Sequence, residues 1–239
     1  MEENEENNKT TYYQVKFVIL GDIFVGKTNI YYRFVNGEFI NNYQSTILID
    51  FLYQKIKIED KLFSLQLWDT AGNEKYKSIA KGYYTNAACC ILVYDITKEE
   101  SFRSINKWAN DVKLYANNNI ILFLVGNKYD LNEERKIEED RGRELASQYN
   151  MEFLEVSAKT GYNIDKIFNI ACQKIYENIK KGLYDENEEE GVKICKTYSD
   201  FAPNKTFSLM VENNNFTYNN YKKNEKNSSS KRKKKRKWC

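Results

Sequence analysis

The stretch "GDIFVGKT" at residues 21–28 carries the most specific information in the chain, because it matches the pattern G-x-x-x-x-G-K-[ST]. The apolar stretch "YYQVKFVIL" (12–20) before it predicts a buried strand, and "GKTNIYYRFV" (26–35) predicts a helix. In this order, loop N–H groups and the helix N-terminus point at phosphates. Lys27 would reach the β- and γ-phosphates, and Thr28 would offer its hydroxyl to Mg²⁺. A chance match in a glycine-containing turn is the alternative, and the strand–loop–helix context disfavours it.

Further strands and helices alternate along the chain. "ILIDFLYQKIKI" (47–58) and "KLFSLQLWD" (61–69) flank a short turn and predict a hairpin. Three more strands are expected at 87–95, 119–127 and 151–158. Helical spacing of apolar residues follows at Phe102, Ile105, Ala109, Val112 and Ala116, and again at Ile164, Ile167, Phe168, Ala171, Cys172, Ile175 and Ile179. The prediction is an α/β fold, with a mostly parallel six-stranded sheet, one antiparallel strand and helices on both faces.

The domain is expected to span residues 11–182, between an acidic disordered N-terminus (1–10) and a flexible tail (183–239). The N-terminus is too acidic for a signal peptide, and no apolar run is long enough for a membrane span. Residues 222–237 carry ten Lys or Arg and one Glu, whereas the whole chain has a net charge of +3, so the body of the chain is acidic. Because no signal peptide is expected, the five cysteines should be reduced. The absence of histidine excludes catalysis by histidine and metal binding by histidine.

Three further motifs follow predicted strands in the order of a guanine nucleotide site. In "DTAG" (69–72), Asp69 could hold Mg²⁺ and Gly72 could turn its N–H toward a terminal phosphate. In "NKYD" (127–130), Asp130 could accept hydrogen bonds from the guanine N1–H and amine, which adenine does not offer. In "SAK" (157–159), a backbone N–H could meet the guanine O6. Each motif alone is weak, and "NKYD" alone is more often an exposed turn, but the four together disfavour chance.

With these motifs, residues 11–182 resemble a small GTPase of the Ras superfamily, and the Rab family in particular. The stretches "STILIDF" (45–51), "LQLWDTAG" (65–72), "YYTNA" (83–87) and "LVYDIT" (92–97) carry the likeness to Rabs. The resemblance implies a P-loop GTPase (G domain) that binds GTP or GDP with Mg²⁺ and acts as a switch in vesicle traffic. It also implies exchange factors, GTPase-activating proteins, chaperones of prenylated Rabs and effectors as partners.

The resemblance also implies a role for individual residues. The nucleotide would contact Gly21, Asp22, Ile23, Phe24, Val25, Gly26, Lys27, Thr28, Phe39, Thr46, Asp69, Gly72, Asn127, Lys128, Asp130, Ser157, Ala158 and Lys159. Phe39 would pack on the guanine face, and Mg²⁺ would be held by Thr28, Thr46 and Asp69. Catalysis would involve Lys27, Gly72 and Asn73. Effectors would contact the aromatic triad Phe51, Trp68 and Tyr83, although ordinary core aromatics are the alternative.

Four residues depart from the Rab pattern. Ile23, Phe24 and Leu48 replace smaller residues, and Asn73 stands where the family has glutamine. An amide at this position orients the attacking water, so we expect slow intrinsic hydrolysis. The alternative is a module that binds GTP and hydrolyses it negligibly.

The basic run at 231–237 and Cys239 predict a peripheral membrane protein of the cytoplasm. Seven cations would attract anionic lipid, and a prenylated Cys239 would supply the second anchoring signal, although Rabs usually have two cysteines and no C-a-a-X box is present here. A soluble nuclear GTPase that uses the run for import, and a solvated basic tail with an inert thiol, are the alternatives. No nucleic acid partner is expected, because no RNA-binding fold is visible.

Overall fold

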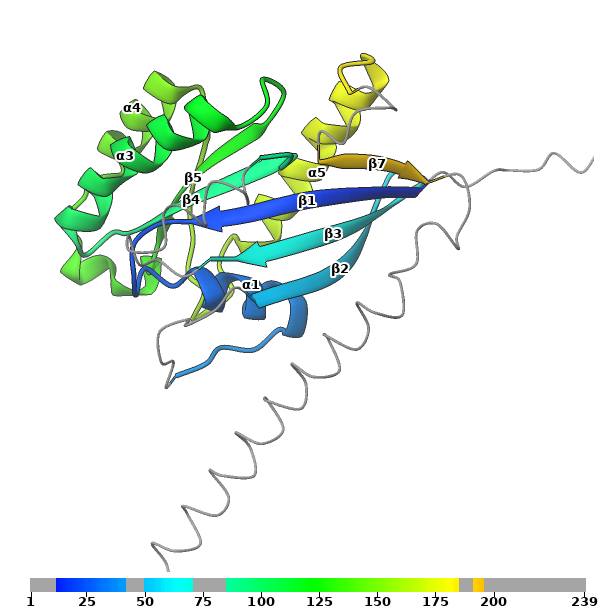
Figure 1. Cartoon of the computed structure of the whole chain (residues 1–239). Helices are drawn as coiled ribbons and strands as arrows, with labels where there is room; N and C mark the ends of the chain where they lie inside the picture. Colours follow the sequence, from blue (N-terminus) through cyan, green and yellow to red (C-terminus); the bar gives the residue numbers. More distant parts are fainter. Residues whose placement is uncertain (1–11, 42–49, 71–84, 185–190, 196–239) are drawn as a thin grey trace, which may run out of the picture. The chain divides into compact units, whose positions relative to one another are not determined.

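The fold is described from a computed structural model, which covers residues 12–41, 50–70, 85–184 and 191–195 (Figure 1). The strands are β1 (Tyr12–Leu20), β2 (Asp50–Ile58), β3 (Lys61–Asp69), β4 (Cys89–Asp95), β5 (Ile121–Asn127), β6 (Glu152–Glu155) and β7 (Val192–Cys195). The helices are α1 (Lys27–Asn36), α3 (Glu99–Tyr115), α4 (Glu139–Tyr149) and α5 (Ile164–Lys180), with a 3₁₀ turn at Tyr129–Glu134.

The strands form one sheet in the order β2-β3-β1-β4-β5-β6, with β7 paired to β1 outside this path. The pairs β3–β1, β1–β4, β4–β5 and β5–β6 are parallel, and β2–β3 is the antiparallel hairpin predicted from the sequence. Parallel neighbours need helical crossovers, which explains the α/β class. The carboxyl ends of β1, β3, β4 and β5 therefore meet at one edge of the sheet, where ligands bind in open α/β folds.

Helices cover both faces of the sheet, as predicted. One core cluster joins β1 residues Val15, Phe17 and Ile19 to α1 and α5, and a second joins Val18 and Leu20 to α3 and α4. The central strand β4 is buried on both faces over its whole length, which is typical of a parallel sheet between two helix layers. This packing fixes the strand ends from which the site is built.

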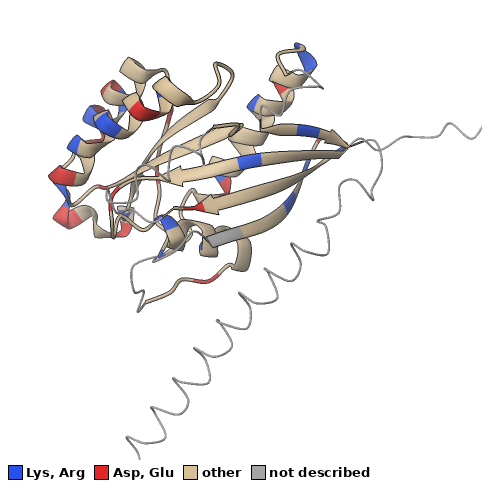
Figure 2. Ribbon diagram, viewed as in Figure 1, with Lys and Arg blue, Asp and Glu red and all other residues tan. Residues whose placement is uncertain are grey.

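The outer surfaces of α3 and α4 carry charges of both signs (Figure 2). Arg141 pairs with Glu99 at 2.8 Å across the two helices, and Arg143 pairs with Glu139 within α4. Such exposed pairs contribute about 0–1 kcal/mol each, so the buried core holds the helices in place.

The strand count differs from the expectation drawn from the sequence. Among the described residues, the sheet has seven strands and a second antiparallel pairing, because β7 lies in the segment that was expected to be a flexible tail. Val192 and Cys195 are buried against the sheet, so these residues belong to the folded domain. The predicted boundary at 182 is also too early, since Tyr184 is buried in the first core cluster.

Among the described residues, none of the helices combines the length and the apolarity needed to cross a bilayer.

Candidate nucleotide-binding site

The loop at 21–28 connects the end of β1 to the start of α1. Gly26 has a φ of 96°, and a Cβ on it would lie 2.3 Å from Asn127 Nδ2. Only glycine fits there without displacing the Asn127 side chain. The loop therefore lies against the end of β5, and α1 begins directly after it. The free N–H groups at a helix N-terminus bind anions.

Lys27 is a buried cation at the start of α1. Its side chain is almost fully buried, and Nζ donates to the carbonyls of Gly21 at 2.9 Å and Asp22 at 2.8 Å. Burial lowers the pKa of Lys27 from 10.5 to about 8, although Asp69 and Asp22 act in the opposite direction. An ammonium that is costly to bury among carbonyls gains from a neighbouring anion. The donor set and its burial therefore fit a phosphate.

Thr28 and Asp69 place two oxygen atoms side by side near Lys27. Thr28 Oγ1 donates to Asp69 Oδ2, and both side chains are buried. A hydroxyl and a carboxylate suit Mg²⁺, so these two residues would hold the ion that neutralises phosphate charge. Thr46, Gly72 and Asn73, which the resemblance also implies, lie outside the described residues.

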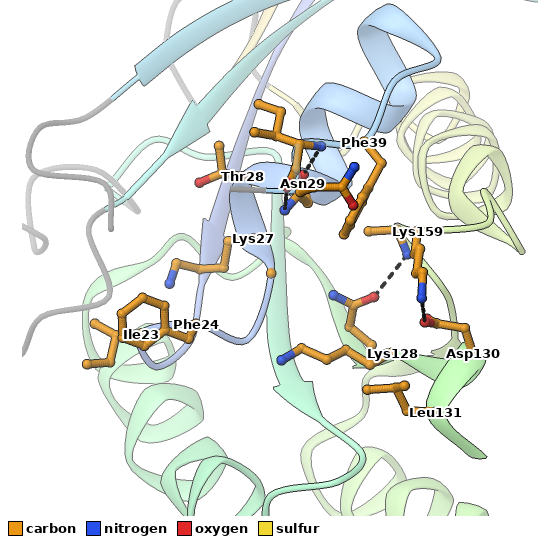
Figure 3. Close-up of a pocket in the computed structure, with 15 residues that line it drawn as sticks. Ile23, Phe24, Lys27, Thr28, Asn29, Phe39, Lys128, Asp130, Leu131 and Lys159 are labelled. Carbon is orange, nitrogen blue, oxygen red and sulfur yellow. Dashed lines mark hydrogen bonds and ion pairs between the residues drawn. The ribbon is translucent and has the colours of Figure 1, made fainter. Parts of the chain in front are cut away.

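A cavity of about 360 Å³ opens beside the loop, large enough for a small ligand (Figure 3). Eleven of the residues implied by the resemblance line it: Ile23, Phe24, Gly26, Lys27, Thr28, Phe39, Asn127, Lys128, Asp130, Ala158 and Lys159. Ile23, Phe24 and Lys27 lie at one end, and Asp130 and Lys159 lie at the other. The structure therefore brings the phosphate motif and the base motifs into one pocket.

The cavity is also lined by four residues that the sequence did not predict: Asn29, Ile40, Asn41 and Leu131. Asn29 Oδ1 accepts from the Ile40 N–H at 2.9 Å and thereby holds the segment that carries Phe39 against α1. No pattern singled out Asn29, because a polar residue in a helix is ordinary. Five described residues that the resemblance implies are not in the lining of the cavity: Gly21, Asp22, Val25, Asp69 and Ser157.

Asn127 links the phosphate loop to the "SAK" loop. Its Nδ2 donates to the Val25 carbonyl at 2.8 Å, and its Oδ1 accepts from the Ala158 N–H at 3.1 Å. The side chain is buried at the end of β5. The Asn127 side chain therefore holds the two loops together.

Asp130 is held in position on the wall of the cavity. Its Oδ1 accepts from Ser157 Oγ at 2.6 Å, and its Oδ2 lies 3.7 Å from Lys159 Nζ. The Asp130 side chain is 14 % exposed, so it can still accept hydrogen bonds from a ligand. A carboxylate oriented in this way suits the two N–H donors of a guanine edge.

A buried acid that the sequence did not reveal positions Lys128. Lys128 Nζ pairs with Asp95 Oδ2 at 2.6 Å, and Asp95 is fully buried at the end of β4. "LVYDIT" marked this segment only as a likeness to Rabs, with no role for its acid.

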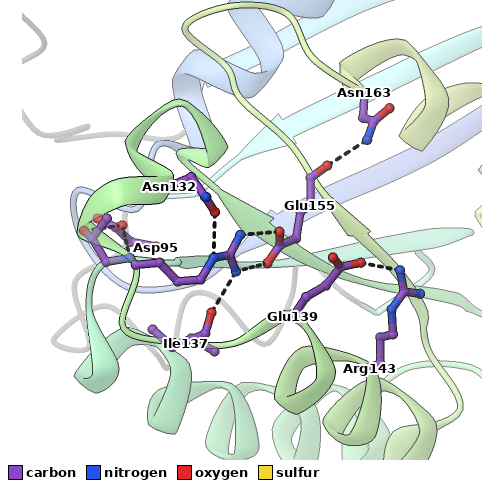
Figure 4. Close-up of polar contacts among 9 residues, drawn as sticks. Asp95, Asn132, Ile137, Glu139, Arg143, Glu155 and Asn163 are labelled. Atoms are coloured by element: carbon purple, nitrogen blue, oxygen red, sulfur yellow. Dashed lines mark hydrogen bonds and ion pairs between the residues drawn. The ribbon is translucent and has the colours of Figure 1, made fainter.

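Two arginines hold the segment after Asp130 and the "SAK" loop in place. Arg135 binds both carboxylate oxygens of Glu155, at 2.6 and 2.7 Å, and also donates to Asn132 Oδ1 and the Ile137 carbonyl, both at 2.8 Å (Figure 4). The hydrogen bonds to Glu155 raise the pKa of Arg135. On the other side, Arg33 of α1 donates to the carbonyls of Ala158 at 2.9 Å and Lys159 at 2.6 Å.

Ile23 and Phe24 give the loop an apolar, exposed wall at the phosphate end. They are 50 % and 57 % exposed, and Phe24 has a φ of 63°, which side-chain-bearing residues rarely adopt. Behind them, Asp22 Oδ1 accepts from Trp108 Nε1 at 3.0 Å, which ties the loop to α3.

Of the predicted aromatic triad, only Trp68 has a described side chain. It is half-buried, packs against the second core cluster and has Lys16 Nζ 5.2 Å from its ring centroid. Phe51 pairs with Trp68 in the β2–β3 register, but its side chain and Tyr83 lie outside the described residues. A half-buried Trp68 is compatible with both an effector surface and a core role.

The chain also matches a protein-family model. The model described as Ras family matches residues 16–177, which is more than half of the 239 residues. The matched range includes every residue that lines the cavity.

Proposed function

The chain belongs to the Ras family, whose members are GTPases and GTP-dependent switches. We propose that it is a Rab-type switch in vesicle traffic. The site geometry supports the nucleotide part of this proposal. The observation that carries it is that one cavity has the buried cation Lys27 at one end and the oriented carboxylate of Asp130 at the other. The Rab-type part rests on the resemblance of the stretches at 45–51, 65–72, 83–87 and 92–97.

Within this proposal, the described residues divide the work. Loop N–H groups and Lys27 bind the phosphates, Asp130 and the "SAK" loop select guanine, and Thr28 and Asp69 hold Mg²⁺. Mg²⁺ supplies charge neutralisation at the phosphates when it is bound. Hydrolysis would be slow, because Asn73 replaces the longer glutamine amide. Exchange factors, activating proteins and effectors would act on this switch, as they do on the family in general.

The tail would place the switch on the cytosolic face of a membrane. Residues 231–237 would bind anionic lipid, and a lipid on Cys239 would provide the second signal that stable anchoring needs.

Two measurements on protein from its native cell test the proposal. Mass spectrometry of the intact protein should find bound GDP or GTP and a lipid adduct. Fractionation should find wild type in membranes and a Cys239→Ser variant in the cytosol. Unchanged membrane association of Cys239→Ser would rule out the lipid anchor, and nuclear accumulation of both proteins would favour a soluble nuclear GTPase.

A second candidate function is a GTP-binding module with negligible hydrolysis. The exposed Ile23 and Phe24 at the phosphate end of the cavity favour it, because their bulk lies where an activating arginine would approach. Single-turnover hydrolysis of bound GTP, with and without an activating protein, separates this module from a switch.

A further inference from the structure

The sheet has a notch beside the first half of β1. The neighbouring strand β4 pairs with β1 only from Phe17 to Leu20, because β4 begins at Cys89. On this side, β1 residues Tyr12–Val15 are paired with β7 instead (Figure 1). A segment from beyond α5 thus fills the place that β4 leaves open.

The tail segment 191–195 fits this notch in detail. The Lys16 N–H donates to the Gly191 carbonyl at 2.8 Å, just before the β1–β7 pairing begins. Val192 and Cys195 are buried and Ile194 packs against the first core cluster, whereas Lys193 is exposed. The notch therefore selects a short strand by both backbone pairing and apolar side chains.

Gly191 makes the fit specific. It has a φ of 82°, and a Cβ on it would lie 2.4 Å from the Ala88 amide nitrogen and 2.6 Å from the Ala87 carbonyl carbon. Both are backbone atoms just before β4, so they cannot move aside as a side chain could. Any other residue at 191 would push this end of β7 out of the notch.

A second contact holds the tail before it reaches the notch. Asn119 Nδ2 donates to the Leu183 carbonyl at 2.7 Å, and Tyr184 OH donates to the Asn119 carbonyl at 3.3 Å. Tyr184 is also buried in the first core cluster. The tail is consequently fixed at two separate points, 183–184 and 191–195.

We propose that the notch is a docking site for the chain's own tail, and that residues 191–195 act as a latch that opens while the domain stays folded. The strand β7 has four residues and a single partner among the described strands, and it contributes only Val192 to the first core cluster, so it should open before the rest of the domain. Opening would move the last point at which the described chain is held from Cys195 to Tyr184, and these 11 residues span at most about 36–40 Å. The docking does not depend on the membrane anchor proposed above.

Thiol labelling of the full-length protein tests the latch, because the chain carries its own reporters. Cys195 is 1 % exposed in β7, and Cys89, Cys90 and Cys172 are fully buried in the core. Alkylation by N-ethylmaleimide under native conditions, mapped by mass spectrometry, reports opening of each site. In wild type, Cys195 should react faster than the three core cysteines.

Gly191→Ala should open the latch and speed alkylation of Cys195 by about tenfold or more, with the core cysteines still protected. Gly182→Ala is the matched control. Gly182 also has a positive φ, of 69°, but nothing lies within 4 Å of its Cβ position, so this variant should keep the wild-type rate.

Two results would overturn the latch. One is equal alkylation of Cys195 in wild type and in both variants. The other is alkylation of Cys195 only together with the core cysteines, which would mean that β7 opens only when the whole domain unfolds. Wild type alone decides this point if Gly191→Ala fails to fold.

Discussion

Glu155 accepts two hydrogen bonds from Arg135, at 2.6 and 2.7 Å, in a site where the two side chains are only 5 % and 11 % exposed. Glu155 lies two residues before Ser157 of the "SAK" loop, and Arg135 follows the turn that carries Asp130. The pair therefore joins the two segments that would recognise a base.

Arg135→Met should lower the free energy of unfolding by about 3–5 kcal/mol, because it leaves Glu155 buried without its ion-pair partner. The chain offers a control in Arg141, whose pair with Glu99 has the same chemistry but is 45 % and 25 % exposed. Arg141→Met should cost about 0–1 kcal/mol. Denaturant unfolding at one fixed GDP concentration measures both, and equal losses would contradict the importance of burial here.

Guanine should be preferred over adenine by about 10³-fold, since a pocket built to accept two N–H donors is left unsatisfied by adenine. Asp130→Asn should shift this preference toward xanthine nucleotides, because the amide donates where xanthine accepts. Competition binding with GTP, ATP and xanthosine triphosphate measures both effects. Comparable binding of ATP and GTP by wild type would show that Asp130 does not read the base.

Nucleotide binding should take up a proton above about pH 8. Burial holds the pKa of Lys27 near 8 rather than 10.5, and a phosphate beside the ammonium would raise it again. Affinity should therefore fall as the pH rises from about 8, where the charged form begins to be lost. Calorimetry of GDP binding at about pH 8.5, in buffers of different ionisation enthalpy, counts the proton.

The same pKa has the opposite consequence for the fold. Between about pH 8 and 10.5 the unfolded chain binds a proton at Lys27 that the folded chain has released. The contribution of Lys27 to the free energy of unfolding consequently rises with pH across this window. Binding that shows no proton uptake at about pH 8.5 would mean that Lys27 does not meet the phosphate.

Intrinsic hydrolysis should be slower than the roughly 3–5 × 10⁻⁴ s⁻¹ of Ras. The amide of Asn73 reaches about 1.5 Å less far than that of glutamine, and a misplacement of about 1 Å can cost on the order of 10²-fold. Asn73→Gln should raise the intrinsic rate in single-turnover assays. It should change the rate with an activating protein little if that protein supplies its own glutamine. If Asn73→Gln were slower than wild type, another residue would have to orient the attacking water.

Most of the sheet and the order of the site motifs could be predicted from the sequence, because apolar runs mark the strands and each motif follows one of them. The apolar face of α5, from Ile164 to Ile175, is buried as its spacing indicated. The helix α4 was missed, since its sequence is mostly polar and buries only Gly142, Leu145 and Ala146. The strand β7 was missed because four residues in a polar segment give no periodic signal.

The contacts that hold the site residues in place could not be predicted from the sequence, because they join segments that are far apart in the chain. Arg33 and Ala158 are 125 residues apart, and a hydrogen bond from a side chain to a distant carbonyl leaves no local pattern. The pairing of Lys128 with the buried Asp95 depends likewise on where β4 and β5 end side by side.

The two hydrogen bonds of Asn127 imply thermodynamic coupling between the two halves of a bound nucleotide. One end of its amide holds the Val25 carbonyl of the phosphate loop, and the other holds the Ala158 N–H beside the base. Because this rigid amide group serves both sides, a disturbance at either side changes the geometry at the other. The binding energies of base and phosphates should then be non-additive, so that weaker contacts at one end of the nucleotide also weaken the contacts at the other.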